Sequence, residues 1–329
     1  MRPPVPTLRG SKPMLSRSMS ARTDSLHGAS LAAPTDGLTL RPPIRIPAAV
    51  WLLLPACALL VLGMLVPVGQ VLWMSLNPPE PGVMTPGTAL TLKNYSRFFA
   101  SDFYVGVLFK TLWLSALATL ITAVLGMLLA LSVWRASPRW RGLMIVAILA
   151  PLLVSIVART YGWIVVLGDK GALNTLLVGA GLLAEPVKIM YTPAAVLIGL
   201  VHVFLPFMVL SLLGSLDRID PSLGEAANSL GASRLATFRH VLLPLTVPGL
   251  ASGSIIVFSL SMSSYVTPAL MGGSRSGVLT TFIYQQFSVT MNWQFGASLV
   301  AILLGATLLV LCAMLSWANW STRHWSAAK

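Results

Sequence analysis

Charged residues are scarce in this chain. They make up 9% of its 329 residues, against 56% for hydrophobic residues, whereas an ordinary soluble domain is about 25% charged. A water-soluble globular protein is not expected from such a composition. Lipid is the more suitable solvent for most of the sequence.

Reactive groups are scarce as well. The sequence has no H-E-x-x-H and no G-x-S-x-G motif, and its apolar stretches hold no carboxylate that could act as an acid or a base. We therefore expect neither an enzyme nor a metal site. The two cysteines, Cys57 and Cys312, lie in the first and last apolar stretches, where we expect them to pack as small apolar side chains and to form no disulfide framework.

Six stretches are long and apolar enough to span a membrane as helices, which takes about 20 residues. They are apolar on all sides, as spanning helices are, and none resembles the short alternating segments of barrel strands. The sequence predicts an all-α integral membrane protein, with a bundle of six transmembrane helices in one domain over residues 48–320. The six stretches lie near residues 48–76, 105–133, 143–167, 194–216, 245–270 and 295–317.

Basic residues are distributed unevenly between the segments that join these stretches. Fifteen lie in the N-terminal part, in the loops after the second and fourth stretches and at the C-terminal end, and six lie in the alternate segments or next to them. By the positive-inside rule, the richer set faces the cytoplasm, which places both termini there. This asymmetry accounts for the formal net charge of +13, so that we expect no nucleic-acid partner.

Residues 1–47 differ from the rest of the chain. They contain eight prolines, six serines and seven basic residues, with too few large apolar side chains to bury a core. We expect a disordered basic N-terminal tail there and a short cytoplasmic C-terminal tail at residues 321–329. No apolar stretch precedes residue 48, so we do not expect a cleaved signal peptide.

The loop at residues 217–244, on the expected cytoplasmic side, has the local signals of two short helices. Asp220 is suited to cap the first helix, with Pro221 at its first position. Gly231 stands where a helix commonly ends in a left-handed residue. Ser233 is suited to cap a second helix that runs to Pro244. Local chemistry predicts a helical elbow, which by itself is equally compatible with a plain connection between two spans.

The same loop carries the string EAANSLGASRLATF, followed by Val-Leu-Leu-Pro. This string resembles the EAA loop of binding-protein-dependent ABC importer permeases, in which the loop forms a coupling helix seated in a groove of the cytoplasmic ATPase subunit. The resemblance implies an ATPase-coupling role for Glu225, Ala226, Ala227 and Gly231, with Asp220 as the cap of the same helix.

The resemblance also implies the setting and the partners of the chain. The setting is a bacterial cell inner membrane, crossed several times and surrounded by lipid. The partners are a cytoplasmic ABC ATPase dimer, a second related permease subunit and a solute-binding protein. The chain has no G-x-x-x-x-G-K-[ST] phosphate loop, so we expect no cofactor in this chain and assign ATP and Mg²⁺ to the partner ATPase.

Three further strings resemble the polyamine (spermidine/putrescine)-type branch of these permeases. They are RTYGWIVVLGDKGALN, VFLPFMVLSLLGSLDRIDPSLGEAA and SSYVTPALMGG, and the resemblance covers roughly residues 48–317. The last string carries serine where many polyamine permeases carry an acidic residue, which weakens the case for a cationic substrate. The expected cargo is a polyamine or a related small organic solute.

Two groups of residues are candidates for the translocation pathway. Arg159 lies well inside the third span, where a charge usually marks a water-filled path or a buried partner, although snorkelling to the outer interface would also explain it. Tyr161 and Trp163, within about one turn of it, are expected either to line an outer vestibule or to belong to an interfacial aromatic belt.

The second group lies in the fifth span, where Ser263, Ser264 and Tyr265 form a polar stretch ahead of Pro268. This proline would loosen the helix, and broken, hydroxyl-rich segments often line a cavity. His202, in the fourth span, is expected to be packed and hydrogen-bonded, with a role as gate or ligand as the alternative.

The main alternative function is a self-contained secondary transporter or channel driven by an ion gradient. Such a protein is expected to carry an acidic proton or sodium site within its spans, and this sequence has none. A permease subunit of an ATP-driven importer is therefore the leading hypothesis.

Overall fold

The computed structural model describes residues 48–80, 82–83, 87–220, 222–273 and 277–326. Within these ranges all regular structure is helical, which confirms the predicted all-α fold. The expected N-terminal tail at residues 1–47 lies outside the described residues. Of the expected C-terminal tail, residues 321–326 continue the last helix.

Five helices of the described chain are long and apolar enough to cross a membrane unaided. A bent pair of helices at residues 138–153 and 156–179 raises the number to six if the pair counts as one span. The five unaided spans contain α1 (Ala48–Ser75), α3 (Asp102–Arg135), α7 (Pro193–Leu216), α10 (Leu243–Ser263) and α13 (Trp293–Ser326).

The third span is not one straight helix, so its predicted continuity is wrong. It consists of α4 (Pro138–Leu149), the 3₁₀ turn η1 (Ala150–Leu153) and α5 (Ile156–Leu167), with a bend of 99° between its two arms. Pro151 has no amide hydrogen to donate to the preceding turn, and the chain is extended at Val154, with ψ 137°. The placement of Arg159 well inside a straight third span therefore does not apply.

A short helix follows α5 after a tight turn. It is α6 (Ala172–Gly179), with Gly171 at its N-cap. A Cβ at Gly171 would lie 2.5 Å from the carbonyl oxygens of Val165 and Val166, so only glycine permits this close return of the chain after α5.

The stretch predicted as the fifth span, residues 245–270, also contains a break, four residues before the proline that was expected to loosen it. Helix α10 ends at Ser263, Ser264 is extended with ψ 127°, and α11 (Val266–Met271) follows. Pro268 stands in the first turn of α11, where its missing amide hydrogen removes no helical bond. The predicted end of the elbow's second helix at Pro244 is wrong, because the helix continues directly into α10.

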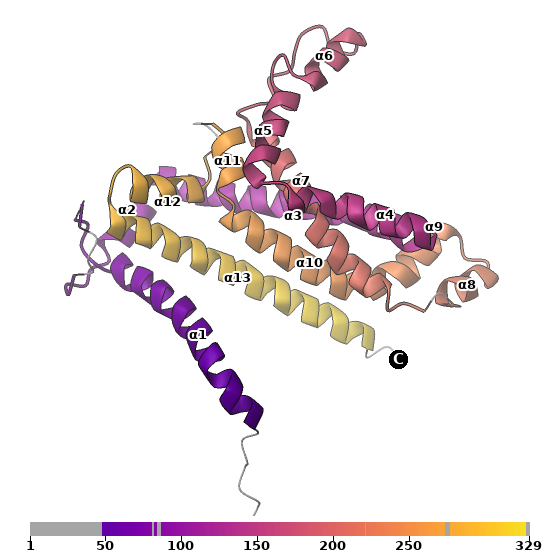
Figure 1. Cartoon of the computed structure of the whole chain (residues 1–329), viewed down its shortest axis with the longest axis horizontal. Helices are drawn as coiled ribbons and strands as arrows, with labels where there is room; N and C mark the ends of the chain where they lie inside the picture. Colours follow the sequence, from indigo (N-terminus) through magenta and orange to yellow (C-terminus); the bar gives the residue numbers. More distant parts are fainter. Residues whose placement is uncertain (1–47, 81, 84–86, 221, 274–276, 327–329) are drawn as a thin grey trace, which may run out of the picture. The chain divides into compact units, whose positions relative to one another are not determined.

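Helices α3, α7 and α10 pack together and hold the main apolar core (Figure 1). A Cβ at Gly253 of α10 would lie 2.6 Å from Met208 Sδ of α7, and one at Gly126 of α3 would lie 2.6 Å from Met208 Cγ. Both glycines therefore permit a close approach of the backbones. The buried hydroxyls of Thr111 and Thr119 donate to carbonyls of the preceding turn at 2.7 Å, which satisfies them inside the core.

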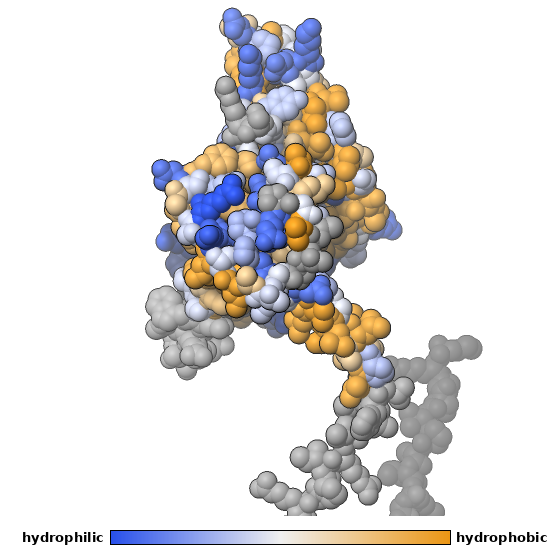
Figure 2. Space-filling view, turned by 90° about the vertical axis from the view of Figure 1, so that its left-hand side faces the viewer, coloured by the Kyte–Doolittle hydropathy of each residue, from blue (hydrophilic) through white to orange (hydrophobic). Residues whose placement is uncertain are grey.

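One end of this bundle carries the short helices α2 (Lys93–Phe99) and α12 (Leu279–Ser288) against α3 and α13. Phe98, Tyr104 and Phe295 form an aromatic cluster there, and Arg97 lies 4.5 Å above the Phe295 ring. Figure 2 looks onto this end, where hydrophilic residues gather, while hydrophobic residues cover much of its right-hand flank.

The chain divides into two units between Ala56 and Cys57, within α1. The most apolar stretch of α1 has no buried residue. Cys57 in α1 and Cys312 in α13 are both exposed, so the expectation that they pack inside the protein is wrong. A small apolar thiol is as compatible with a lipid-facing surface as with a core.

Candidate functional site

The predicted elbow is present between α7 and α10. It consists of α8 (Ser222–Ser229) and α9 (Arg234–Thr237), and it lies at the end of the bundle opposite to α2 and α12 (Figure 1). A π-helical turn, η2 (Phe238–Leu242), joins α9 to α10. The elbow is thus continuous with one of the three core helices.

Hydrogen bonds at both helix starts confirm the predicted caps. Asp220 Oδ1 accepts the backbone N–H of Ser222 at 2.9 Å, and this bond lowers the pKa of the Asp220 carboxyl below its usual value. Ser233 Oγ accepts the backbone N–H of Ala236 at 3.2 Å. Pro221 lies outside the described residues. Each cap supplies an acceptor to an amide that its helix leaves without one.

The end of α8 confirms the predicted left-handed glycine. Gly231 has φ +84°, and the N–H of Ala232 donates to the carbonyl of Ala227 at 3.0 Å. This bond is the long-range member of the Schellman arrangement, which closes a helix around a left-handed residue. Gly231 therefore sets the angle between the two arms of the elbow.

The elbow carries apolar side chains that are largely or partly exposed. Leu230 is 88% exposed, Leu235 is 74% exposed and Leu223 is 44% exposed. Ala226 is exposed and Ala227 is half-buried. The side chain of Glu225 lies outside the described residues, although its backbone belongs to α8. An exposed apolar helix face beside small residues is suited to close docking against another protein.

A second group of predicted residues lies on α5 and α7. Trp163 Nε1 donates to His202 Nδ1 at 3.2 Å, and their rings meet edge to face. The expectation that His202 is packed and hydrogen-bonded is confirmed. Arg159 stands about one turn before Trp163 on α5, whereas Tyr161 is 55% exposed and has no described contact with this group.

The third group surrounds the break between α10 and α11. The carbonyl of Ser264 lies ahead of α11 and outside its hydrogen-bonding pattern, and the Thr280 hydroxyl of α12 donates to it at 2.7 Å. Ser263 Oγ bonds back to the carbonyl of Ser259 at 3.1 Å. A side chain of α12 thus stabilises the interrupted backbone, as polar groups do at helix breaks inside membranes.

Tyr265 stacks on Tyr284 of α12, with ring centroids 4.7 Å apart. Beside them lies a hollow of about 330 Å³ whose walls include Tyr265, Thr281 and Gln285. Aromatic rings and polar side chains therefore lie side by side at this hollow, next to residues that were expected to line the pathway. The contribution of α12 was not predicted from the sequence, although LTTFIYQQFS holds a run of Thr, Tyr and Gln residues.

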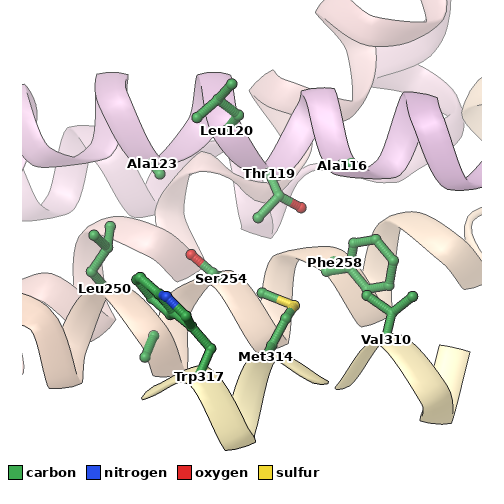
Figure 3. Close-up of a pocket in the computed structure, with 11 residues that line it drawn as sticks. Ala116, Thr119, Leu120, Ala123, Leu250, Ser254, Phe258, Val310, Met314 and Trp317 are labelled. Carbon is green, nitrogen blue, oxygen red and sulfur yellow. The ribbon is translucent and has the colours of Figure 1, made fainter. Parts of the chain in front are cut away.

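A larger hollow, of about 410 Å³, opens between α3, α10 and α13 (Figure 3). Apolar side chains such as Leu250, Met314 and Trp317 line most of it, and the hydroxyls of Thr119 and Ser254 are its polar groups. Its chemistry suits an apolar occupant, so it is not a candidate for the path of a polar solute.

Comparisons with known proteins agree with these features. The family described as "Binding-protein-dependent transport system inner membrane component" matches residues 122–321. The spermidine/putrescine transport system permease protein PotB of Escherichia coli strain K12 is 37% identical over 254 residues, covering 72% of this chain and 92% of the relative. PotB of Haemophilus influenzae is 35% identical over 221 residues, covering 67% and 76%.

Among solved structures, the fold resembles a chain of a bacterial ABC transporter involved in the import of the acidic polysaccharide alginate. The TM-score is 0.68 at 18% sequence identity, and the match covers 83% of this chain and 96% of the other. A likeness at this identity concerns the fold and carries no information on the cargo.

Proposed function

Because this chain belongs to the family of binding-protein-dependent transport system inner membrane components, we propose that it forms half of the translocation pathway of an ATP-driven importer. Its place is the inner membrane, with a small solute delivered to its outer face by a binding protein. Family membership disfavours the alternative of a self-contained secondary transporter or channel, since members of this family act within a larger assembly.

The observation that carries this proposal is the elbow. Its two helices are individually capped, Gly231 holds the angle between them, and the apolar face with Leu230 and Leu235 is exposed. A rigid lever with an uncovered face, continuous with core helix α10, is suited to transmit movement from a docked subunit to the bundle. Glu225, Ala226 and Ala227 would contact that subunit.

The docked subunit would be one of two cytoplasmic ATPases. The chain has no phosphate-binding loop of its own, so ATP and Mg²⁺ would bind to the ATPases and hydrolysis would occur there. A second, related permease would form the other half of the pathway, as half-transporter subunits require a partner to enclose a path.

The topology we propose has six spans, with the bent pair α4–α5 as the third and both termini in the cytoplasm. The basic residues support this arrangement through the positive-inside rule. The transmembrane domain would then occupy residues 48–320, with cytoplasmic tails on either side, and the loop at residues 217–244 would face the ATPases.

For the cargo, the relatives' names give the starting point, since PotB is a spermidine/putrescine permease in two bacteria. We assign to this chain a small organic solute of similar size. The pathway would run past Arg159 and Trp163 and past the break at Ser264 and Tyr265, where polar and aromatic side chains meet in the otherwise apolar bundle.

Co-purification tests this function. Replacing Glu225 by Lys, or Gly231 by Val, should reduce the amount of ATPase recovered with the permease, or separate ATP hydrolysis from uptake. Gly224→Ala is the matched control, because Gly224 lies in α8 with open space around it. Undiminished uptake and ATPase recovery in both elbow variants would sink the proposal.

A further inference from the structure

Arg159 has donors without acceptors. Its Nε and Nη1 atoms are shielded from solvent, and neither has a hydrogen-bond partner among the described residues. A guanidinium is always charged in proteins, and shielding such a group without a partner is unfavourable. Arg159 also stands in the first turns of α5, at the positive end of the helix dipole, which increases the cost.

The chain offers no carboxylate to neutralise this charge from within the neighbouring spans. The sequence has no Asp or Glu between Asp102 and Asp169, between Glu185 and Asp217, or after Glu225. These intervals contain α7, α10, α11 and α13 entirely, and α3 apart from its first residue. The missing anion therefore has to come from outside the helices that surround Arg159.

His202 adds another donor in the same part of the bundle. Its Nδ1 accepts the indole N–H of Trp163, so a neutral imidazole at this position carries its proton on Nε2. Trp163 stands about one turn after Arg159 on α5, so the guanidinium and the Nε2–H of His202 are a set of donors in one region of the bundle. Such a set favours an anion with two oxygen atoms, because a carboxylate accepts from several N–H groups at once.

The position of this donor set fits a transport pathway. Helix α5 follows the bend of the third span, and it packs against α7 and against α11, which follows the break in the fifth span. The segments that follow the two breaks therefore pack together, in an apolar cluster that includes Leu167 of α5 and Met271 of α11. Interrupted helices at membrane depth are typical of substrate sites in transporters.

We infer that Arg159 and His202 bind the carboxylate of the transported solute. The cargo is then a small organic acid, with or without an amino group, and not a simple polyamine. This inference rests on the proposed importer function and names the substrate class of its pathway.

Protection of Arg159 from chemical modification tests the inference on the wild-type protein. The assembled complex of permease and ATPase subunits, purified in detergent, is treated with phenylglyoxal, which modifies guanidinium groups, and the Arg159 peptide is quantified by mass spectrometry. The probes are acetate, 4-aminobutyrate, and putrescine as the matched diamine, with sodium chloride at equal ionic strength. Arg141, which pairs with Asp217 at 2.6 Å, is the internal control.

Acetate and 4-aminobutyrate should slow the modification of Arg159 by about threefold when present at about twice their Kd, whereas putrescine and chloride should leave it unchanged. His202→Ala should weaken the protection by acetate without altering the reactivity of Arg141. Equal protection by chloride, or none by either carboxylate, would overturn the inference.

An Arg159 that stays unreactive without any added ligand would also overturn it, since a lipid phosphate or a partner subunit would then occupy the guanidinium permanently. These negative results would not contradict the importer function. That function is tested separately, by ATPase recovery and uptake in the variants of the elbow.

Discussion

Gly231 has the left-handed backbone on which the elbow depends. Its φ is +84°, and a Cβ built there would meet no atom within 4 Å. Substitution is therefore opposed by backbone conformation alone, which costs about 1–2 kcal/mol for a residue with a Cβ. We predict that Gly231→Ala lowers the ratio of solute transported to ATP hydrolysed, measured in proteoliposomes that contain the complete importer.

Two variants control this prediction. Gly231→Asn should retain more coupling than Gly231→Ala, because Asn tolerates the left-handed region. Gly224→Ala should be neutral or stabilising, since Gly224 is helical and its Cβ position is also open. If Gly224→Ala reduced coupling as much as Gly231→Ala does, the effect would not come from the backbone conformation of Gly231.

For individual residues, the sequence predicts the hydrogen bonds that join groups close together in the chain. The caps of Asp220 and Ser233 and the turn at Gly231 depend on amides within three residues, so residue type and spacing suffice to predict them. The pairing of Trp163 with His202 and the stacking of Tyr265 on Tyr284 join separate helices. Such contacts depend on how the helices pack, which the local sequence does not encode.

Two of the stretches expected from hydropathy to be continuous helices contain a break, one after η1 and one after α10. Proline alone does not predict the breaks, because Pro206 and Pro248 lie inside continuous helices. The break after α10 has a donor from another helix, Thr280, for the carbonyl of Ser264. An interruption is stable where the surrounding structure satisfies the freed backbone groups, and that condition is tertiary.

Thr280→Val tests this account of the break. It keeps the shape of the side chain and removes the donor to Ser264, which leaves a carbonyl unsatisfied at a cost of about 1–3 kcal/mol. We predict a lower thermal unfolding temperature of the detergent-solubilised permease. Thr307→Val is the control, because the Thr307 hydroxyl bonds only to the carbonyl of Leu303 in its own helix. Equal losses in the two variants would refute a special role for Thr280.

In the proposed topology of the whole molecule, the elbow and both chain termini lie on the same side of the membrane. Single cysteines in a background with Cys57 and Cys312 replaced by Ser report this with a membrane-impermeant maleimide on intact spheroplasts. We predict that Lys188→Cys is labelled from outside, and that Arg139→Cys and Ser229→Cys are labelled only after lysis. Labelling of Arg139→Cys in intact spheroplasts would contradict the six-span topology.

The central claim is that the elbow is where a separate ATPase drives this permease, and cysteine cross-linking of the purified importer tests it most directly. With Cys57 and Cys312 replaced, Ala226→Cys in α8 is compared with Lys188→Cys, using a short bifunctional maleimide and a single cysteine in the ATPase groove. The account predicts a permease–ATPase product from Ala226→Cys, none from Lys188→Cys, and uptake that stops when the product forms. An ATPase that never cross-links to α8 in an importer that still transports would contradict it.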